Sequence, residues 1–403
     1  MLNNEMLFGV ALGIENPLYI EKVMFDKEAG ELHIHINFVK GSKFKCSVCG
    51  RDGLPVYDTE EKIWRHLNFF QYKCFLHFRT PRSNCPEHGV HLINVPWANK
   101  SSGFTMLFEA LVMCLAKEMP ISAIADMVDE HDTRIWRIIR SYVTKAYTEQ
   151  SFEEVRSIGV DETSSKKGHN YISIFADMIN GKVIYATEGK DSNTIANFAD
   201  ELLRHDAKPE QISEVSMDMS PAFISGVNND LPKASVTFDK FHVIKKLNEA
   251  LDEVRREEQK TNPLLRRSRY VWLKNPGNLR KSESEKLESL SHANLKTGKV
   301  YRMKLIFQDI YNTQKNQVAA EVAIKQWLSW ASRSRIEPVK EFARLVKSHY
   351  KGILHYFESG LTNGVIEGIN SRIQEAKRRA KGYRNIKNFI TMVYLEAGQL
   401  NFT

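Results

Sequence analysis

The chain has 403 residues, which is long for one domain and predicts about two to four folded units. Its hydrophobic fraction of 42% is sufficient for folded cores and excludes a wholly disordered chain. The formal net charge of +8 favours polyanionic partners, although many proteins with this charge bind no nucleic acid.

The N-terminal residues and the cysteines indicate the compartment. The first residues lack the basic start and the apolar core of a signal peptide, and no apolar run approaches the roughly 18 residues of a membrane helix. The five cysteines are an odd number, and Cys46-Ser47-Val48-Cys49 indicates a metal or redox pair. We therefore expect a cytoplasmic protein without a membrane partner.

Residues 1–100 are expected to form an N-terminal zinc-ribbon domain. The segment Glu31–Phe38 alternates with a period close to two, as in a β-strand. Two pairs of ligand-type residues are separated by further strand-like segments, which is the pattern of a structural zinc site with four protein ligands. The expected zinc ligands are Cys46, Cys49, Cys85 and His88.

Three other residues compete for the zinc site. Cys74 lies in a strand-like stretch and has no partner three residues away, so packing is favoured for it. His66 and His77 stay open as alternative ligands. If no metal binds, the cysteines are simply reduced thiols.

Residues 101–150 are expected to form a helix-turn-helix domain. Apolar residues recur at helical spacing from Phe104 to Leu115, Pro120 opens a short second segment, and a third helix begins near Asp132. Three helices with a short second one are typical of helix-turn-helix proteins. Arginines beside the apolar stripe of the third helix favour DNA contacts over a merely solvated face. They are Arg134, Arg137 and Arg140.

Residues 151–258 are expected to form the first part of a mixed α/β catalytic core. A strand is predicted to end at Asp161, a hairpin to turn at Asn180-Gly181, and a further strand to end at Asp218. A last strand, Ala234–Phe238, precedes a long basic helix. Three meander strands followed by β-α-β units predict a mixed sheet with helices packed on it.

The remainder of the chain is predicted to be almost entirely helical and basic. Residues 259–350 and 351–403 both have this character, and Glu367 lies at the start of a predicted helix in the second of these segments. Clusters of basic side chains here are expected to contact DNA phosphates without sequence preference. The expected contacts are Arg266, Arg267, Arg378, Arg379, Lys381 and Arg384.

Asp161, Asp218 and Glu367 are the candidate catalytic residues. The two aspartates each follow an apolar strand run, which places both at strand ends, where open sheets bind ligands. Glu367 would reach the same place from a helix laid against the sheet. Carboxylates suit two Mg²⁺ ions about 3.5–4 Å apart, which activate the attacking oxygen and neutralise the leaving oxygen in phosphoryl transfer. Each residue alone is more simply a surface turn or solvated helix residue, so the prediction depends on all three.

Asp239 and His242 form an Asp-x-x-His unit directly after the last predicted strand. In one interpretation Asp239 helps to ligate metal and His242 contacts the scissile phosphate. In the other, Asp239 caps the following helix and His242 packs. The sequence favours neither.

Three acidic segments and several other motifs occur in a characteristic order. The acidic segments are Gly159-Val160-Asp161-Glu162, Ser216-Met217-Asp218-Met219-Ser220 and Thr362-Asn363-Gly364-Val365-Ile366-Glu367-Gly368-Ile369-Asn370. The further motifs are the Cys-x-x-Cys pair, Trp64-Arg65-His66-Leu67, Cys85-Pro86-Glu87-His88-Gly89, Val95-Pro96-Trp97-Ala98, Phe238-Asp239-Lys240-Phe241-His242-Val243 and Arg378-Arg379-Ala380-Lys381-Gly382-Tyr383-Arg384-Asn385. In this order they resemble the ISL-three (ISL3) family of bacterial insertion-sequence transposases over nearly the whole chain.

The resemblance implies a multidomain α+β protein whose ribonuclease-H-like catalytic domain is interrupted by a helical insertion. Glu367 follows Asp218 by 149 positions (367 − 218), which leaves room for that insertion at residues 259–350, with residues 351–403 as the C-terminal helices of the catalytic core. The resemblance implies a DDE transposase that uses two Mg²⁺ ions, with Mn²⁺ as a substitute, and acts on terminal inverted repeats and target DNA. A homodimer or larger assembly, active at the bacterial nucleoid, is expected because two element ends must be joined.

Trp272, Trp327 and Trp330 of the insertion are expected to be core residues, with stacking on a displaced base as the alternative. Two rival functions stay open. The first is a DNA-binding regulator that has lost catalysis, which the presence of all three carboxylates disfavours. The second is a ribonuclease-H-like nuclease or resolvase that cuts DNA without joining it.

Overall fold

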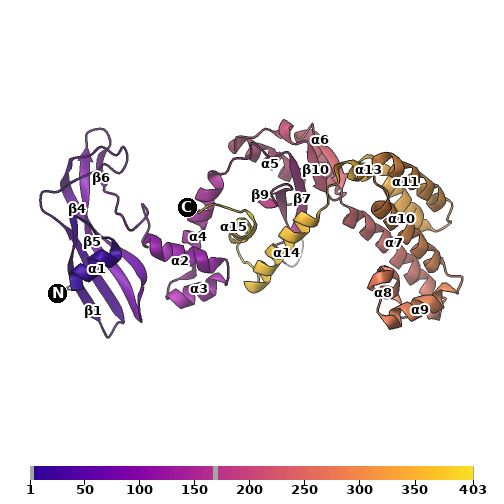
Figure 1. Ribbon diagram of the computed structural model, residues 1–403, viewed down its shortest axis with the longest axis horizontal. Coiled ribbons are helices and arrows are strands. Elements are labelled where there is room, and N and C mark those ends of the chain that lie inside the picture. The colour runs from indigo at the N-terminus through magenta and orange to yellow at the C-terminus, as the bar shows by residue number, and fades with distance from the viewer. Residues whose placement is uncertain (1–3, 167–170, 403) are drawn as a thin grey trace. The chain divides into compact units, whose positions relative to one another are not determined.

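The computed structural model describes residues 4–166 and 171–402, which fold into two compact units (Figure 1). The first unit ends at Tyr142 and the second begins at Val143. Helix α4 (Asp132–Thr148) spans this boundary, so the third helix of the helix-turn-helix also connects the two units along the chain.

A six-stranded sheet is the main element of the first unit. Its strand order is β1-β2-β5-β4-β3, with β6 paired to β5. Strands β2 and β5 are parallel, whereas the remaining neighbours are antiparallel. The predicted ribbon is therefore one part of a larger sheet, whose elements are α1 (Asn4–Leu12), β1 (Leu18–Asp26), β2 (Glu31–Phe38), β3 (Lys43–Phe44), β4 (Leu54–Phe69), β5 (Tyr72–Cys85) and β6 (Gly89–Leu92).

Alternate side chains of this sheet form its core. Leu32, Ile34 and Ile36 of β2 are buried together with Leu76 and Phe78 of β5. The residues between them are only half-buried. This alternation is the period of two that predicted the strands from the sequence.

Three helices follow the sheet and confirm the predicted helix-turn-helix. They are α2 (Met106–Ala116), α3 (Ile121–Val128) and α4. Thr105 caps α2 because its hydroxyl oxygen accepts a hydrogen bond from the backbone N–H of Phe108 at 3.4 Å. On α4, Ile135, Ile138 and Ile139 are buried at the helical spacing of the apolar stripe.

The second unit is built on a five-stranded sheet with the order β11-β10-β7-β8-β9. Strands β11, β10 and β7 are parallel, and β7, β8 and β9 form an antiparallel meander. This is the predicted combination of a meander and β-α-β units. Its strands and first helices are β7 (Ser157–Ser164), β8 (Tyr171–Asp177), β9 (Lys182–Glu188), α5 (Asn193–Arg204), β10 (Glu214–Met217), α6 (Pro221–Asp230) and β11 (Ser235–Phe238).

The strand that carries Asp161 is longer than predicted. The prediction that it ends at Asp161 is wrong, because β7 continues to Ser164 through antiparallel pairing with β8. Its parallel pairing with β10 ends at Gly159. Asp161 therefore lies where one neighbouring strand has ended and the other continues.

Nine α-helices follow β11 in the described part of the chain. Helices α7 to α13 pack around one apolar core, and α14 and α15 return to the sheet (Figure 1). They are α7 (Lys240–Gln259), α8 (Arg269–Leu273), α9 (Lys281–Ser291), α10 (Lys296–Thr313), α11 (Gln317–Ser332), α12 (Glu337–Ser348), α13 (Tyr350–Ser359), α14 (Gly364–Arg379) and α15 (Ile386–Ala397).

The insertion tryptophans belong to this core. Trp272 is 1% exposed and donates its indole N–H to the hydroxyl of Ser268 at 3.1 Å. Trp327 is 2% exposed and donates to the carbonyl of Met303 at 2.9 Å, while Trp330 packs against the same core. Their role as core residues is thus confirmed, because stacking on a DNA base would require Trp272 or Trp327 to leave the core.

The two faces of β7 have different neighbours. Ile158 and Val160 belong to the core cluster that includes Phe198 of α5. Gly159 lies on the opposite face because side chains alternate along a strand, and a β-carbon there would meet the side chain of Ile366 on α14. Helix α14 therefore covers the face of the sheet to which Asp161 also belongs.

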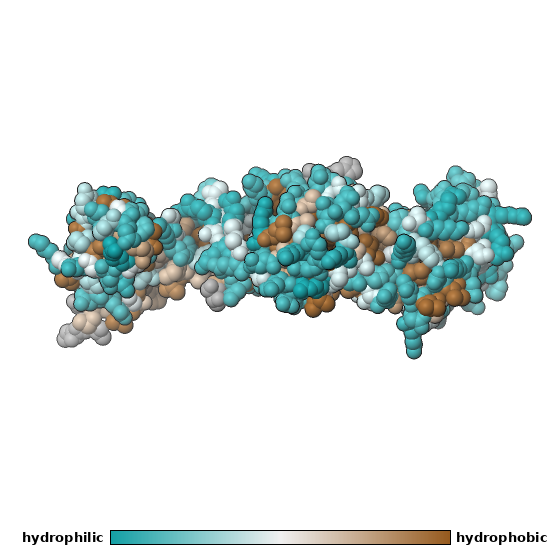
Figure 2. Space-filling view, turned by 90° about the horizontal axis from the view of Figure 1, so that it is seen from above, coloured by the Kyte–Doolittle hydropathy of each residue, from teal (hydrophilic) through white to brown (hydrophobic). Residues whose placement is uncertain are grey.

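The face of the molecule seen in Figure 2 is mostly polar. On the face seen in Figure 2, hydrophilic side chains cover most of the area and hydrophobic ones form smaller patches. Among the described residues, no helix has both the length and the apolar character required to span a bilayer.

We predict that Gly159→Ala weakens the packing of α14 on β7. A methyl group at this position would contact Ile366 and lie 2.6 Å from the sulfur of Met178, so these side chains must shift. Overpacking of this kind costs about 1–3 kcal/mol, which should appear as a lower free energy of unfolding in urea.

Gly368→Ala on the same helix is the matched control. No atom lies within 4 Å of the β-carbon it would add, and alanine in place of a helical glycine stabilises by up to about 1 kcal/mol. If both variants had the same free energy of unfolding, the close approach at Gly159 would not limit the packing of α14.

Candidate functional site

The four predicted zinc ligands come together in the first unit. Cys46 and Cys49 belong to the turn between β3 and β4, Cys85 ends β5, and His88 lies in the turn before β6. One ligand atom from each of the four residues lies within 4.8 Å of all the others. The Sγ atoms of Cys49 and Cys85 are 3.8 Å apart, and Sγ of Cys85 is 3.6 Å from Nδ1 of His88.

This ligand set fits zinc. Thiolate sulfur and imidazole nitrogen are its usual ligands, and four protein ligands in a tetrahedral site leave no open position for chemistry. Local turns aim the cysteines inward, since the backbone N–H of Val48 lies 3.4 Å from the Cys46 sulfur and that of Gly50 donates to the Cys46 carbonyl at 3.0 Å. The set is thus suited to holding the fold together.

The three rival ligands are engaged elsewhere. Cys74 is 2% exposed within the sheet core, where burial raises the pKa of its thiol to about 12. A ring nitrogen of His66 lies 2.8 Å from the hydroxyl of Thr105, and His77 Nε2 lies 2.9 Å from His33 Nδ1. Packing of Cys74, as the sequence favours, agrees with these contacts.

The second unit aligns three aspartates across its parallel strands. In the pairing of β10 with β7, Ser216 lies opposite Gly159, so continuing the register by two residues places Asp218 beside Asp161. In the pairing of β10 with β11, Met217 lies opposite Phe238, and the next position places Asp239 beside Asp218. The row lies at the carboxyl ends of β10 and β11, where open sheets bind ligands.

The charges of these aspartates act on one another. Burial raises the pKa of the Asp161 carboxyl, and the carboxylates of Asp218 and Asp239 raise it further. The backbone N–H of Glu162 and the imidazole of His242 act in the opposite direction. A cation between the carboxylates would relieve this repulsion, so the donor set fits a divalent metal ion with a preference for oxygen ligands.

Helix α14 is fastened to the same sheet edge by polar side chains. The hydroxyl of Ser216 donates to Oδ1 of Asn363 at 2.5 Å, directly before α14 begins. The amide nitrogen of Asn370 donates to Oδ2 of Asp161 at 2.6 Å. One and two turns further, Gln374 and Lys377 bond to the strand at Thr163 and Ser164.

The position of Glu367 depends on these polar contacts of α14 with the sheet. It lies in the first turn of α14, three residues before Asn370, and residues with this spacing are neighbours on one helix face. Its side chain is exposed. Glu367 therefore lies one helical turn before the residue that bonds to Asp161.

The triad is more widely spaced than the zinc ligands. Among residues 4–166 and 171–402, the cysteine and histidine set is the one group of three or more potential ligands whose atoms all lie within 4.8 Å of one another. Asp161, Asp218 and Glu367 do not approach that closely.

Of the two interpretations left open by the sequence for Asp239 and His242, the structure bears out the helix-capping role of Asp239. Asp239 is the N-cap of α7, and its Oδ2 also accepts a hydrogen bond from Nδ1 of His242 at 2.9 Å. This hydrogen bond raises the pKa of His242, as do the charges of Asp161 and Asp218. His242 thus lies within the field of the aspartate row.

No role was predicted for Asn370 from the sequence. It occurs in the third acidic segment, and its spacing of three from Glu367 on a predicted helix would have placed both on one face. Its partner, Asp161, is 209 residues away, and nothing in the local sequence indicates that pairing.

The arginines of α4 differ in exposure and in ion pairing. Arg137 and Arg140 are exposed. Arg134 is ion-paired with Glu130, and its guanidinium lies 4.4 Å from the ring centroid of Phe104. Arg137 and Arg140 are thus better placed to reach a partner than Arg134.

Most of the basic residues predicted for DNA contact in the second unit are exposed. Arg379 is the exception, because it is half-buried and ion-paired with Glu396. The exposed ones are Arg266, Arg267, Arg378, Lys381 and Arg384.

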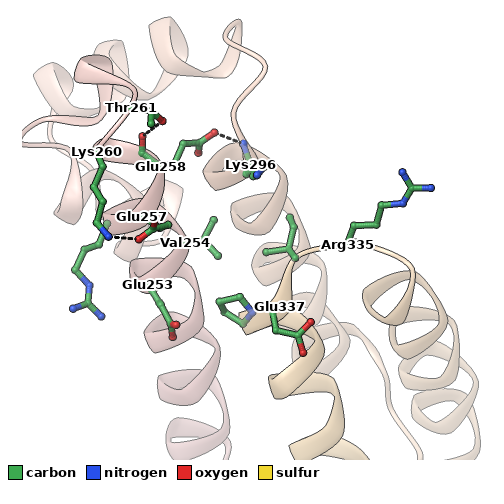
Figure 3. A pocket seen from close by; sticks show the side chains of 12 residues that line it. Glu253, Val254, Glu257, Glu258, Lys260, Thr261, Lys296, Arg335 and Glu337 are labelled. Carbon is green, nitrogen blue, oxygen red and sulfur yellow. Dashed lines mark hydrogen bonds and ion pairs between the residues drawn. The ribbon is translucent and has the colours of Figure 1, made fainter.

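A cavity of about 970 Å³ at the end of α7 contains none of the predicted site residues (Figure 3). Its lining carries four acidic and four basic side chains, so it has no net charge that would attract a polyanion. One of the acidic residues, Glu258, already accepts hydrogen bonds from the backbone N–H groups of Lys296 and Thr297, both at 2.8 Å. It caps the start of α10 in this way, so the cavity is not a second candidate for the active site.

Comparison with protein-family models gives three matches along the chain. A transposase model of the ISL3 group matches residues 158–393, which is more than half of the chain. A model for the helix-turn-helix domain of transposase family ISL3 matches residues 93–143. A model for the zinc-finger of transposase IS204/IS1001/IS1096/IS1165 matches residues 42–88.

Individual proteins are similar over most of the chain. The transposase for insertion sequence element IS1557 of Mycobacterium tuberculosis is 29% identical, with 98% of this chain and 96% of the relative covered. The transposase for insertion sequence element IS1001 of Bordetella parapertussis is 26% identical, with coverages of 86% and 87%. A chain in a solved structure of the simian T-cell lymphotropic virus intasome in complex with PP2A regulatory subunit B56 gamma is 14% identical over 46% of this chain and 69% of its own length, with a TM-score of 0.18.

We predict that Cys46→Ser removes zinc from the protein. Losing one of four ligands should lower the metal content from about one zinc per chain to near zero, as measured by mass spectrometry after gel filtration. The first unit should then unfold at a lower temperature.

Cys74→Ser is the control for the alternative ligand. It also replaces a buried thiol, but it should keep its zinc because Cys74 lies outside the ligand set. Zinc loss from this variant, or full zinc content in Cys46→Ser, would refute the ligand assignment.

We also predict that Asp161→Asn stabilises the protein when divalent ions are absent. Because the folded pKa of Asp161 is raised, its contribution to stability is present below the unfolded pKa of about 4 and is lost as the pH rises through the folded pKa. At pH 7 a neutral amide should therefore raise Tm, because it removes a charge that burial and the neighbouring carboxylates disfavour.

The gain should shrink as the pH falls through the folded pKa of Asp161, because protonation then neutralises the wild-type carboxyl as well. Asp200→Asn on the exposed face of α5 should leave Tm unchanged at both pH values. An Asp161→Asn variant with a lower Tm than wild type at pH 7 would contradict the repulsion within the aspartate row.

Proposed function

Because the chain belongs to the ISL3 family of insertion-sequence transposases, we propose that it cuts and joins DNA strands with Asp161, Asp218 and Glu367. The observation that carries this assignment is the register of β7 and β10, which aligns two aspartates from separate parts of the chain. The hydrogen bond from Asn370 to Asp161 supports the third member, since it brings the Glu367 face of α14 to the same strand.

The chemistry follows from this donor set. Two Mg²⁺ ions, or Mn²⁺ in their place, would be held by the three carboxylates and would activate the attacking oxygen and neutralise the leaving one. Both steps of the reaction are in-line displacements at phosphorus, first by water and then by the freed 3′-hydroxyl. One site can therefore perform cleavage and strand transfer.

Asp239 and His242 would assist at the edge of this site. Asp239 holds His242 through Nδ1, which leaves Nε2 of the imidazole free to donate to a phosphate oxygen. The raised pKa of His242 favours the protonated, cationic form that would bind a phosphate. Asp239 itself is 4% exposed, so its contribution to metal binding would be smaller than that of Asp218.

The first unit would recognise the ends of the element. Its helix-turn-helix presents Arg137 and Arg140, and to a lesser extent Arg134, for contact with the terminal inverted repeats. Zinc held by the cysteine and histidine set would keep the sheet folded. The exposed basic residues of the second unit would add phosphate contacts with the element and the target DNA.

We further propose that the active form is a homodimer or a larger assembly on DNA at the nucleoid. Joining two element ends requires two active sites to be held together. The rival interpretations, a regulator without catalysis and a nuclease without strand transfer, have less support because the transposase family model covers the acidic residues.

We predict that Asp218→Asn abolishes cleavage but not DNA binding. Removing one metal ligand costs several kcal/mol of transition-state stabilisation, which corresponds to a loss of at least about 10³-fold in rate. The assay is nicking of a supercoiled plasmid that carries the element ends, with Mg²⁺ present, and binding of the ends is measured in parallel without Mg²⁺.

Asp200→Asn is the matched control and should cleave at the wild-type rate, because Asp200 lies on the exposed side of α5. Cleavage by Asp218→Asn at a similar rate would refute the triad. Wild-type cleavage without strand-transfer products in a two-ended assay would favour the nuclease interpretation.

A further inference from the structure

The Trp64-Arg65-His66 segment of β4 contacts the helix-turn-helix region with each of its residues. Trp64 packs edge-on against Trp97, with ring centroids 5.6 Å apart. A ring nitrogen of His66 lies 2.8 Å from the hydroxyl of Thr105, the N-cap of α2. Arg65, between them, extends to the turn between α3 and α4. The proposed catalytic and zinc sites assign no role to this segment.

Arg65 is a buried cation that connects sheet and helices. It is 2% exposed, and its backbone exchanges hydrogen bonds with Gly103 (2.9 Å) and Thr105 (3.0 Å). Within β4 its side chain donates to the carbonyl of His66 and to Oδ1 of Asn68. It also donates at 3.4 Å to the carbonyl of Cys74 on β5 and to that of Val128 at the end of α3. One guanidinium thus bonds to a strand of the sheet and to the second helix of the helix-turn-helix.

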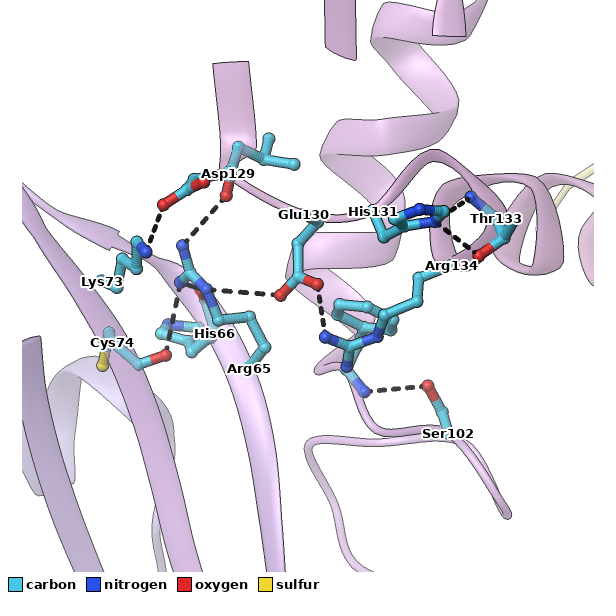
Figure 4. A network of polar contacts seen from close by, with 12 residues as sticks. Arg65, His66, Lys73, Cys74, Ser102, Asp129, Glu130, His131, Thr133 and Arg134 are labelled. Carbon is cyan, nitrogen blue, oxygen red and sulfur yellow. Dashed lines mark hydrogen bonds and ion pairs between the residues drawn. The ribbon is translucent and has the colours of Figure 1, made fainter. Parts of the chain in front are cut away.

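Glu130 in the α3–α4 turn is the counter-charge of Arg65 (Figure 4). Its Oε1 lies 3.9 Å from Nε of Arg65, and its side chain is only 8% exposed. Among the described residues, the buried Nε of Arg65 has no hydrogen-bond partner, so the ion pair with Glu130 compensates its charge. The other oxygen of Glu130 binds Arg134 in the first turn of α4.

The same turn has a second tie to the sheet. Lys73 of β5 forms an ion pair with Asp129, the residue in left-handed conformation that ends α3. This pair is more exposed than the pair of Arg65 and Glu130. The turn between α3 and α4 is therefore bound to β4 through Glu130 and to β5 through Asp129.

We propose that Arg65 and Glu130 are positioning residues that fix α4 on the zinc-bearing sheet, so that its exposed arginines meet one stretch of DNA in a single pose. This inference rests on the proposed recognition of element ends by the helix-turn-helix. Specific binding requires base-reading side chains in a defined position, whereas phosphate contacts tolerate movement. The loss of either charge should thus affect specific binding far more than non-specific binding.

The test compares full-length Arg65→Met, Glu130→Gln and the double variant with wild type, without Mg²⁺. Affinity is measured by fluorescence anisotropy on a duplex of the terminal repeat and on a scrambled duplex of the same composition. Each single variant should bind the repeat at least about tenfold more weakly and the scrambled duplex within about twofold of wild type. The double variant should lose no more affinity for the repeat than the single variant that binds it more weakly, because the two residues act as one pair.

Zinc content and Tm are measured for every variant, so that a folding defect is recognised. If Arg65→Met does not fold, Arg65→Lys replaces it, because lysine keeps the charge but lacks the planar fork that reaches several acceptors. The control is Arg82→Met with Asp58→Asn, an ion pair that joins β4 and β5 of the same sheet. These control variants should bind both duplexes like wild type.

Two results would overturn the inference. One is a folded Glu130→Gln variant with wild-type affinity for the repeat, and the other is an equal loss of affinity for both duplexes. A wild-type protein that does not distinguish the repeat from the scrambled duplex would instead refute the proposed end recognition. The two failures are therefore distinguishable.

Discussion

The close approach of α14 to β7 is the contact on which the candidate active site depends. Glycine at position 159 lets Ile366 lie against the strand, where any larger residue would displace it. Polar bonds from Asn363, Asn370 and Gln374 then fix the helix along the sheet. Without this docking, Glu367 would be an ordinary exposed helix residue, since its side chain has little burial of its own. Apolar packing thus determines how near the helix comes, and the polar bonds determine its register.

The two candidate metal sites illustrate different physical solutions. The cysteine and histidine ligands lie within 4.8 Å of one another, because tight turns and a strand end hold them in place. The aspartate row is looser, and burial together with mutual repulsion raises the pKa of Asp161. A closed set of soft ligands suits a structural ion, whereas an open set of repelling carboxylates suits hard ions that must also bind substrate. The repulsion within the aspartate row lowers the free energy of unfolding, which is expected where a function requires several like charges close together.

Buried polar interactions have a different role in each unit. In the first unit, Arg65 joins the sheet to the helix-turn-helix through carbonyl groups and Glu130, so that the orientation of α4 depends on directional bonds. In the second unit, the helices between β11 and α14 are held by a continuous apolar core that includes Trp272 and Trp327. Apolar contact tolerates small shifts, but a buried charge pair does not, because an unpaired ion in the interior is costly.

The sequence by itself determined those features that depend on local spacing. The Cys-x-x-Cys pair with Cys85 and His88 identified the zinc ligands, Asn180-Gly181 identified the hairpin, and helical periodicity identified α2 to α4. Asp161 and Asp218 were recognisable because each follows an apolar strand. Only the tertiary structure decided that β7 continues to Ser164, that Asn370 binds Asp161, and that Arg134 is paired with Glu130 near Arg65. The physical reason is that the partner strand determines where a strand ends, and a side chain across an interface determines whether a charge is neutralised. Local periodicity contains no information about partners that are distant in the chain.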